Sequence, residues 1–440
     1  MRLWVLSLFV AFWAACAQAA LPVERVVSPG GIEAWLIRDS ANPVISLNLI
    51  FRGGSALDPA GKDGLARMVA GLLDEGAGEL DSQGFQGRLD DLAISLHFDA
   101  GRDTFSGQVK TLSENREEAF RLLRLALTAP RFDAEPVERI RGQLAAMLKQ
   151  ESTSPGALAD NRLQAALFPG HPYGRPAKGT LAGLGAVRTE DLRTFVARRL
   201  ARDNLFVGVA GDIAPADLGR LLDETFGGLP AKAASWALPD IEPAKGRVEV
   251  VDLAVPQSTI AFAQAGLKRK DPNFYAAFVL NHILGGGTFS SRLFEEVREK
   301  RGLAYSVSSH LEPRDASALL AGSAGTANAR AAETVAVVRE EWRRLAVRGV
   351  GAPELQDAKT YLTGSFPLRF SSSDRIAATL ASIQVDGLGI DYLERRNAYI
   401  EAVTLEQVNG LAGRLLDPDG LAFVVVGRPE GLAAGASHGR

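Results

Sequence analysis

A helix followed by an apolar strand occurs twice in this chain and limits what it can fold into. VRTEDLRTFVARRL (residues 187–200) leads into NLFVGVAGD, and VTLEQVNGLAGRLL (residues 403–416) leads into GLAFVVVG. The copies lie about 215 residues apart, a period that is too long for a solenoid and indicates a duplicated domain. The length of 440 residues also exceeds the roughly 250–300 residues at which one core stops growing. We therefore predict two domains of similar construction rather than two unrelated domains with similar ends.

The pattern of apolar residues predicts strands and helices in no strict alternation. Ile45, Leu47, Leu49 and Phe51 alternate with polar residues, which is the period of a half-buried strand. Further strands are predicted at 204–210, 248–253 and 258–263, and helices are predicted after Gly64 and at 114–127, 137–150, 191–200 and 272–284. This mixture favours the α+β class over a doubly wound sheet.

A Pro-punctuated stretch marks the boundary between the two domains. Pro230, Pro239 and Pro243 interrupt an Ala-rich segment without a clear period, which is typical of a linker. We assign residues 1–19 to a signal peptide, 20–228 to the first domain, 229–246 to the linker, 247–430 to the second domain and 431–440 to a flexible tail.

The N-terminal residues resemble a secretory signal. Arg2 precedes an apolar run, residues 3–15, that is too short to span a bilayer, and a small-x-small cleavage site ends at Ala19. We predict export to the periplasm. Lipid attachment at Cys16 is the less favoured alternative, because Trp13 fits a lipoprotein site poorly. Cys16 is the only cysteine, so the mature chain has no internal disulfide.

The charge balance excludes one class of partner. The sequence carries 49 Lys and Arg against 52 Asp and Glu, for a net charge of −3. Proteins that bind DNA or RNA need a clustered basic surface. We therefore expect no nucleic-acid partner.

Residues 285–305, GGGTFSSRLFEEVREKRGLAY, are the most informative segment. A Gly-rich turn runs into a charged helix, and Gly302 suits a left-handed stop after that helix. Tyr305 then begins a predicted strand, in which the alternation places it on the same face as Leu303 and Val307.

This segment resembles the second-domain signature of the pitrilysin/insulinase family of zinc peptidases. GGSALDPAGKDGLA (residues 53–66) and HPYGRPAKGT (residues 171–180) are similar to first-domain segments of that family. The resemblance covers nearly the whole mature chain. It implies two homologous α/β-sandwich domains of the metallopeptidase-like type, each a mixed sheet with helices packed on one face.

The zinc signature of that family is missing from the first domain. In the family, two His four residues apart on a helix bind zinc, and a Glu between them is the general base. Here Arg67 and Gly71 occupy the His positions, Ala70 occupies the Glu position, and the later ligand position falls at about Met147. Arg67, Gly71 and Ala70 neither bind zinc nor accept a proton at neutral pH. We therefore predict a degenerate zinc site and no metal or other cofactor on this chain.

No other cluster in the sequence replaces the missing metal site. The five histidines include no pair at helical ligand spacing. We predict that His282 is packed or caps a helix and that His171 has a structural role. Glu295 and Glu296 are adjacent on a helix and point apart, so we predict a solvated face rather than an acid/base pair.

Arg298 and Tyr305 match an Arg and a Tyr that, in the family, donate hydrogen bonds to carbonyl oxygens of the substrate. A fixed guanidinium and a phenol can stabilise charge that develops on a carbonyl under attack. Gly285, Gly286 and Gly287 either let a substrate backbone approach closely or only shape a tight turn.

Some members of the family divide the work between two homologous chains. The resemblance therefore implies a non-catalytic, substrate-binding subunit of a periplasmic heterodimeric metallopeptidase that cleaves peptides or unfolded polypeptides. This chain would be inactive alone, and a homologous partner with His-x-x-Glu-His would supply zinc and the general base. Two alternatives stay open: a non-enzymatic scaffold, and a periplasmic peptide-binding or chaperone-like protein of the same fold.

Overall fold

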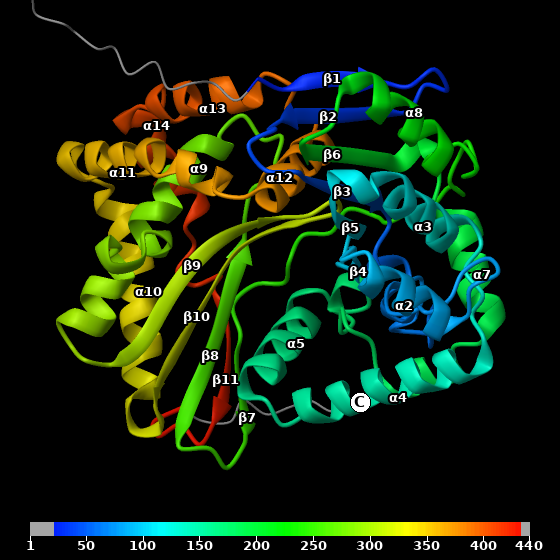
Figure 1. The fold of residues 1–440 in the computed structure, drawn as a ribbon. Coiled ribbons are helices and arrows are strands. Elements are labelled where there is room, and N and C mark those ends of the chain that lie inside the picture. Colours follow the sequence, from blue (N-terminus) through cyan, green and yellow to red (C-terminus); the bar gives the residue numbers. More distant parts are fainter. Residues whose placement is uncertain (1–21, 433–440) are drawn as a thin grey trace, which may run out of the picture.

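The computed structural model describes residues 22–432, which form two mixed β-sheets surrounded by helices (Figure 1). The predicted signal peptide, with Cys16, and all but the first two residues of the predicted tail lie outside the described residues. None of the helices between residues 22 and 432 is long and apolar enough to cross a bilayer.

The first sheet has the strand order β1-β2-β6-β3-β5-β4, in which β2 and β6 are parallel and the other neighbours antiparallel. Its strands are β1 (Glu24–Val27), β2 (Glu33–Arg38), β3 (Val44–Arg52), β4 (Ser95–Ala100), β5 (Thr104–Leu112) and β6 (Leu205–Gly211). The helices of this half are α1 (Leu65–Ala70), α2 (Ser82–Asp91), α3 (Arg116–Thr128), α4 (Ala134–Glu151), α5 (Pro155–Leu167), α6 (Leu181–Ala186), α7 (Thr189–Arg199) and α8 (Pro215–Phe226).

The second sheet has the order β7-β11-β8-β10-β9, with β7 and β11 parallel and the rest antiparallel. Its strands are β7 (Val248–Asp252), β8 (Gln257–Ala265), β9 (Ala304–Pro313), β10 (Ala318–Ala327) and β11 (Ala422–Gly427). The helices are α9 (Phe274–Asn281), α10 (Ala331–Arg348), α11 (Ala352–Gly364), α12 (Ser373–Asp386), α13 (Tyr392–Glu401) and α14 (Leu405–Leu415). The order and directions of these five strands repeat those of β2-β6-β3-β5-β4 in the first sheet, so the two halves share one topology. The predicted fold class is confirmed.

One predicted helix is much shorter than its apolar stripe suggested. The helix after Gly64 ends at Ala70, and a turn then leads to Gly76, whose φ of +108° is readily adopted only by glycine. Leu72 and Leu73 are nevertheless buried in that turn. The apolar pattern therefore predicted correctly that these residues are buried, but it did not predict where the helix ends.

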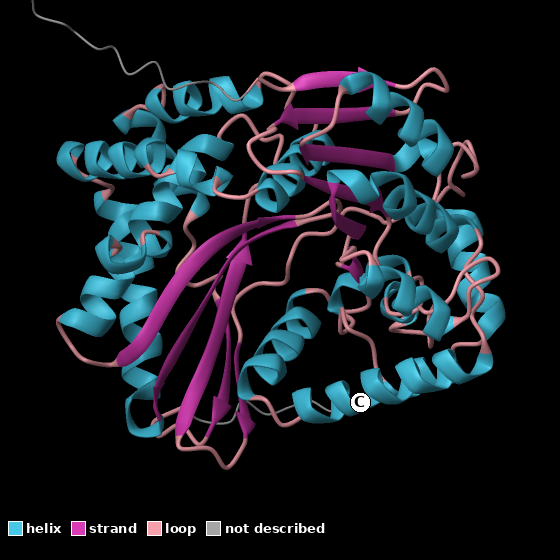
Figure 2. Ribbon diagram, viewed as in Figure 1, coloured by secondary structure: helices cyan, strands magenta, loops and turns pink. Residues whose placement is uncertain are grey.

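Each sheet buries one face beneath the helices of its own half (Figure 2). In the first half, Leu47 and Leu49 of β3 share a core with Phe120 of α3. In the second half, the rings of Phe262 on β8 and Trp342 on α10 pack edge to face with centroids 5.6 Å apart. These two cores are the layers that the alternating apolar patterns predict.

The opposite face of the first sheet is covered by α12, a helix from the second half (Figure 1). Ala210 of β6 packs with Ile376 and Leu380 of α12 in one cluster. A Cβ at Gly208 of β6 would overlap the carbonyl oxygen of Ala377. The close approach of strand and helix therefore requires glycine at this position.

The exchange is reciprocal, because α5 of the first half covers the second sheet. Ala261 and Ala263 of β8 form a cluster with Leu163 and Leu167 of α5, while the alternate residues of β8 face the other core. Small side chains on these faces let the exchanged helices lie close to the strands. Each sheet thus carries helices of its own half on one face and one helix of the other half on its second face.

We expect Gly208→Ala to destabilise the whole chain, because the new methyl group meets backbone that cannot move aside. Overpacking of this kind typically costs about 1–3 kcal/mol. Gly142 lies within α4 and has no neighbouring heavy atom within 4 Å of an added Cβ, so Gly142→Ala should be neutral or slightly stabilising. Urea denaturation followed by circular dichroism measures both effects. Equal stability of the two variants would contradict the packing of α12 described here.

Candidate functional site

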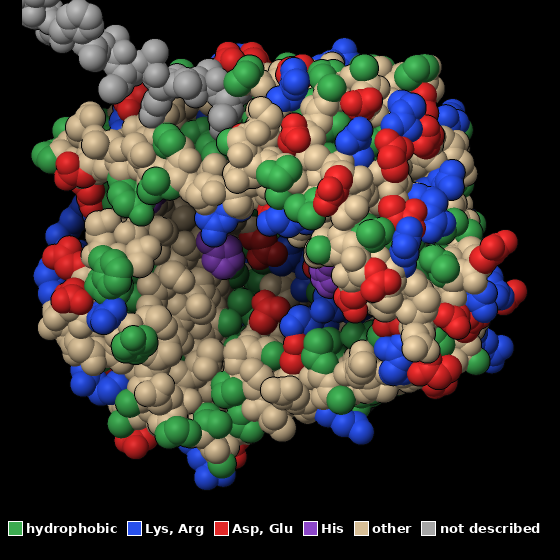
Figure 3. Space-filling model, in the orientation of Figure 1, with side chains coloured by type: hydrophobic (Ala, Val, Ile, Leu, Met, Phe, Trp, Pro, Cys, Tyr) green, Lys and Arg blue, Asp and Glu red, His purple; other side chains and the backbone are tan. Residues whose placement is uncertain are grey.

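The two halves enclose a hollow in which basic, acidic and His side chains gather (Figure 3). The edge strands β4 and β9 end the two sheets. Polar side chains are exposed at alternate positions along them, with His97 and Asp99 on β4 and Ser308 and His310 on β9. His97 and Asp99 were not among the predicted site residues, although the alternation of polar and apolar residues in 95–100 is the signal that would have found them.

Arg67, at the first degenerate zinc position, forms an ion pair with Asp99 of β4. The Arg67 side chain is 28% exposed and the Asp99 side chain 52%. The pair joins α1 to the edge strand of the first sheet. Because a guanidinium stays protonated, it keeps a positive charge at the position where the family places a zinc ligand.

The other degenerate positions are closed by packing. Ala70 is 4% exposed and belongs to the core of the first half. A Cβ at Gly71 would lie 3.1 Å from Cγ2 of Ile140 on α4, which is tighter than ordinary contact. Met147 lies on α4, half buried. Within residues 22–432, no group of three His, Cys, Asp or Glu side chains is arranged to hold a metal ion.

The two first-half segments that resemble the family hold α1 in place through hydrogen bonds. The Asp58 carboxylate accepts from the N–H groups of Gly64 at 2.9 Å and Ala66 at 3.1 Å, which caps the start of α1. Burial raises the pKa of this carboxyl to about 6. Arg175 donates to the carbonyl oxygens of Ala56 and Asp58, each at 2.9 Å. These segments therefore have a structural role that needs no metal.

His171 and His282 are also structural. Nδ1 of His171 accepts from the N–H of Tyr173 at 3.1 Å, so Nε2 carries the proton and donates to the carbonyl oxygen of Pro239 at 3.0 Å. His282 is buried against Tyr361, with ring centroids 5.0 Å apart, and its burial lowers its pKa. The predictions of a structural His171 and a packed His282 are confirmed.

Arg298 lies in a wide turn of the signature helix, η7 (Phe294–Glu299). Its guanidinium stacks over the rings of Phe294 at 4.7 Å and Tyr305 at 5.1 Å from the centroids. Nε is 3.9 Å from the Glu299 carboxylate, which is too long for a hydrogen bond. No residue in the described part of the chain accepts a hydrogen bond from this guanidinium. The two rings thus orient a cation whose donors face no protein acceptor.

Tyr305 stands at a β-bulge in the edge strand β9. Adjacent residues of β10 lie opposite Ala304 and Ser306, so Tyr305 between them has no partner. Tyr305 is 80% exposed, whereas Leu303 and Val307 are buried. The prediction that Tyr305 shares their face is wrong, because the bulge interrupts the alternation and turns the phenol outward onto Arg298. Gly302 has a φ of +59°, which confirms the predicted left-handed stop before this strand.

Packing alone accounts for the three glycines before the signature helix. A Cβ at Gly285 would lie 2.5 Å from Oγ of Ser309, and one at Gly286 would lie 2.7 Å from Nδ2 of Asn281. A Cβ at Gly287 would lie 2.8 Å from the carbonyl oxygen of His282. The turn is therefore tight at each position. Contact of these glycines with a substrate stays a prediction.

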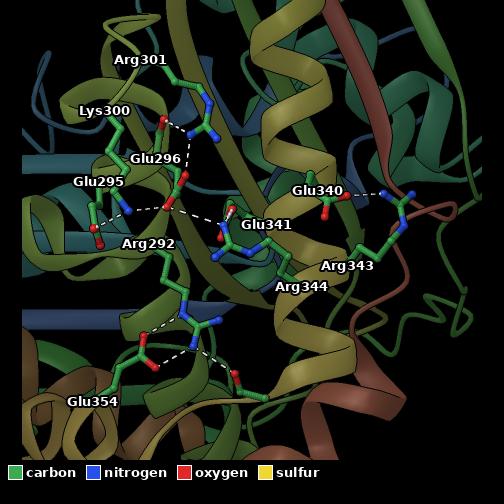
Figure 4. Close-up of polar contacts among 11 residues, drawn as sticks. Arg292, Glu295, Glu296, Lys300, Arg301, Glu340, Glu341, Arg343, Arg344 and Glu354 are labelled. Atoms are coloured by element: carbon green, nitrogen blue, oxygen red, sulfur yellow. Dashed lines mark hydrogen bonds and ion pairs between the residues drawn. The ribbon is translucent and has the colours of Figure 1, made fainter.

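The buried carboxylate of Glu296 anchors the signature helix to α10 through an ion-pair network with partly exposed cations (Figure 4). Its carboxylate lies 2.7 Å from Nζ of Lys300, 2.5 Å from Arg301 and 3.6 Å from Arg344 of α10. Glu295 is exposed, but Glu296 is only 6% exposed. The prediction of a solvated face is therefore wrong for Glu296, because Arg344 approaches from a helix far along the chain. Hydrogen bonds from Lys300 and Arg301 lower the pKa of Glu296 to about 2.

Residues 186–362 match the family model of the peptidase M16 inactive domain. Over this segment the chain is similar to the M16 peptidases. This agrees with the pitrilysin/insulinase signatures in the sequence, so the predicted resemblance is confirmed. The matched residues include the signature segment with Arg298 and Tyr305, and they leave out the degenerate zinc positions at α1.

Relatives of this chain align with it over nearly their whole length. The Helicobacter pylori non-peptidase homolog YmxG is 28% identical over 412 residues, which covers 93% of this chain and 95% of the relative. A Mycobacterium leprae protein named as an uncharacterized zinc protease is 27% identical over 407 residues, which covers 91% of each chain.

Solved structures also align with this chain over nearly its whole length. A peptidase M16 inactive domain from Pseudomonas fluorescens superposes with a TM-score of 0.87 at 28% identity, over 94% of this chain and 99% of that one. A chain of complex III2 from Candida albicans matches with a TM-score of 0.76, over 94% of this chain and 98% of that one. Its identity is 17%, so this second likeness shows the fold alone. The chain thus contains a domain similar to the peptidase M16 inactive domain, which fits a non-catalytic subunit.

We expect Glu296→Gln to lower the free energy of unfolding at pH 7 by about 1–2 kcal/mol, since Lys300 and Arg301 are partly exposed and screened by solvent. The folded-state pKa of about 2 lies below the unfolded value of 4.5. The ion pairs therefore stabilise the fold above that unfolded value, and their contribution is lost as the pH falls toward 2. Denaturation at several pH values measures the difference between wild type and variant, which should shrink below pH 4.5.

Glu295→Gln is the matched control for this change. The Glu295 side chain is 57% exposed and has one ion pair, with Lys300 at 2.8 Å. Its loss should cost less than about 0.5 kcal/mol at any pH. A pH-independent effect of Glu296→Gln, or an equal effect of both variants, would contradict the network.

Proposed function

We propose that this chain is the non-catalytic, substrate-binding subunit of a periplasmic heterodimeric zinc metallopeptidase that cleaves peptides or unfolded polypeptides. A homologous partner chain supplies zinc and the general base. This chain supplies Arg298 and Tyr305, which donate hydrogen bonds to the main chain of the substrate. It also forms part of the wall around the substrate.

The orientation of Arg298 is the observation that carries the proposal. Its guanidinium stacks over two rings and makes no hydrogen bond to the described residues, and its side chain is 34% exposed. The hydroxyl of Tyr305 likewise makes no hydrogen bond to the described residues. Both side chains are accessible to solvent, so their donors are open to a ligand. A pair that serves a ligand needs to be fixed in place with its donors free, and that is the arrangement present here.

The absence of zinc-binding side chains on α1 supports the assignment of the chemistry to a partner. Arg67 is paired with Asp99, and a side chain at Gly71 would crowd Ile140. Neither position offers a lone pair to a metal or a base for water. A chain that can bind a peptide but cannot activate water requires a second chain for hydrolysis.

We expect the purified chain to bind less than stoichiometric zinc and to cleave no unfolded peptide alone. Mixing it with the homologous His-x-x-Glu-His chain should give cleavage that a chelator abolishes. Metal content by mass spectrometry and turnover of a quenched fluorescent peptide provide the two measurements. Robust hydrolysis by the isolated chain would overturn the proposal. A mixture that shows no more activity than the zinc-bearing chain alone would favour the non-enzymatic scaffold.

In the mixed enzyme, Arg298→Ala and Tyr305→Phe should each lower kcat/KM by about a hundred- to a thousandfold, the usual cost of losing one donor to a developing oxyanion. Assembly of the two chains, measured by size-exclusion chromatography, should not change. Val347→Ala is the control, because Val347 on α10 is 79% exposed and lies outside this cluster. Full turnover by both site variants would show that the pair has no role in binding.

A further inference from the structure

One aromatic side chain just before the signature helix is largely exposed. Phe289 is 72% exposed, yet it lies in a turn that hydrogen bonds hold firmly. The carbonyl oxygen of Gly287 accepts from Oγ of Ser290 at 2.9 Å, and that of Thr288 accepts from Oγ of Ser291 at 3.0 Å. The turn thus presents most of a phenyl ring to solvent, and exposed apolar surface costs free energy.

The backbone of this turn is also strained at Thr288. Its φ of +49° lies in the left-handed region, where a β-branched residue is unfavourable. Ala93 and Phe132 are the other described non-glycine residues with positive φ, and neither is β-branched. Strain of this kind persists only where the surrounding structure enforces it, and such residues concentrate at ligand sites. The strained residue directly precedes Phe289.

Phe289 belongs to the same side-chain cluster as the Arg298 and Tyr305 pair. Its ring packs edge to face on Phe294, with centroids 4.9 Å apart, and the Arg298 guanidinium lies over the same Phe294 ring at 4.7 Å. Arg298 in turn stacks on Tyr305. The two ends of this cluster, Phe289 and Tyr305, are among the most exposed large hydrophobic residues of the described chain.

We propose that Phe289 is a specificity-determining residue that binds an aromatic or large aliphatic side chain of the polypeptide whose main chain is held by Arg298 and Tyr305. This inference rests on the proposed function. Successive side chains of an extended peptide project to opposite sides, with a rise of about 3.3 Å per residue. A peptide whose carbonyl oxygens reach Arg298 therefore places a neighbouring side chain within range of the Phe289 ring. Ring stacking and apolar burial favour an aromatic or branched aliphatic group there over a small or acidic one.

The test measures binding by the full chain alone, so it does not depend on the zinc-bearing partner. The probes are fluorescently labelled unfolded peptides that are identical except for one position, which is Phe, Leu, Ala or Asp. We expect the wild-type chain to prefer Phe and Leu over Ala by about tenfold in Kd, the usual discrimination of a partly enclosed apolar contact. Phe289→Ala should reduce this preference to less than about threefold, and Phe289→Leu should retain most of it.

Three comparisons separate this inference from the proposed function. Arg298→Ala should weaken binding of all four peptides by a similar factor and leave the preference intact, and Val347→Ala should change neither. If peptides bind but Phe289→Ala leaves the preference unchanged, the role of Phe289 is overturned while the proposed function stands. The same conclusion follows if Phe289→Ala weakens only assembly with the partner chain. If no peptide binds at all and the mixed enzyme is inactive, both proposals are overturned.

Discussion

The reciprocal exchange of α5 and α12 is the constraint on which the rest of the molecule depends. Each helix packs against the sheet of the other half, α12 on Ala210 of β6 and α5 on Ala263 of β8. Neither half can then bury both faces of its sheet alone. The exchange fixes the position of the first-half helix α1 relative to the edge strand β9, and it thereby determines the shape of the hollow that both halves line (Figure 3).

The segments around α1 are held by hydrogen bonds that serve the fold. Asp58 still caps α1, and Arg175 still bonds the carbonyl groups of the loop before it. These bonds satisfy buried backbone groups, so their loss would destabilise the fold whether or not zinc is bound. Arg67, Ala70 and Gly71, at the degenerate zinc positions, make no such side-chain hydrogen bonds to buried backbone groups. Arg67 instead pairs with Asp99, which joins helix and edge strand through an ion pair between side chains.

The sequence predicted local features well and contacts between distant segments poorly. The duplicated topology followed from the repeated helix–strand ends, and the stop at Gly302 followed from glycine chemistry. The face of Tyr305 was wrong because a bulge depends on pairing with β10, which no pattern within β9 reveals. The burial of Glu296 was missed because Arg344 belongs to another helix. Small residues such as Gly208 were the only sign of the exchanged helices in the sequence. Small residues occur in strands for many unrelated reasons, so they do not predict such an exchange.

In the second half, several features restrict the side chains of Arg298 and Tyr305. The Arg298 guanidinium stacks on Phe294 and Tyr305, which limits the conformational freedom of a flexible side chain. The bulge brings the phenol to the guanidinium, and the Glu296 network ties the helix that carries Arg298 to α10. Each of these features changes the local structure around Arg298 and Tyr305. Together they hold Arg298 and Tyr305 next to each other, and the side-chain donors of both residues form no hydrogen bond within the described chain.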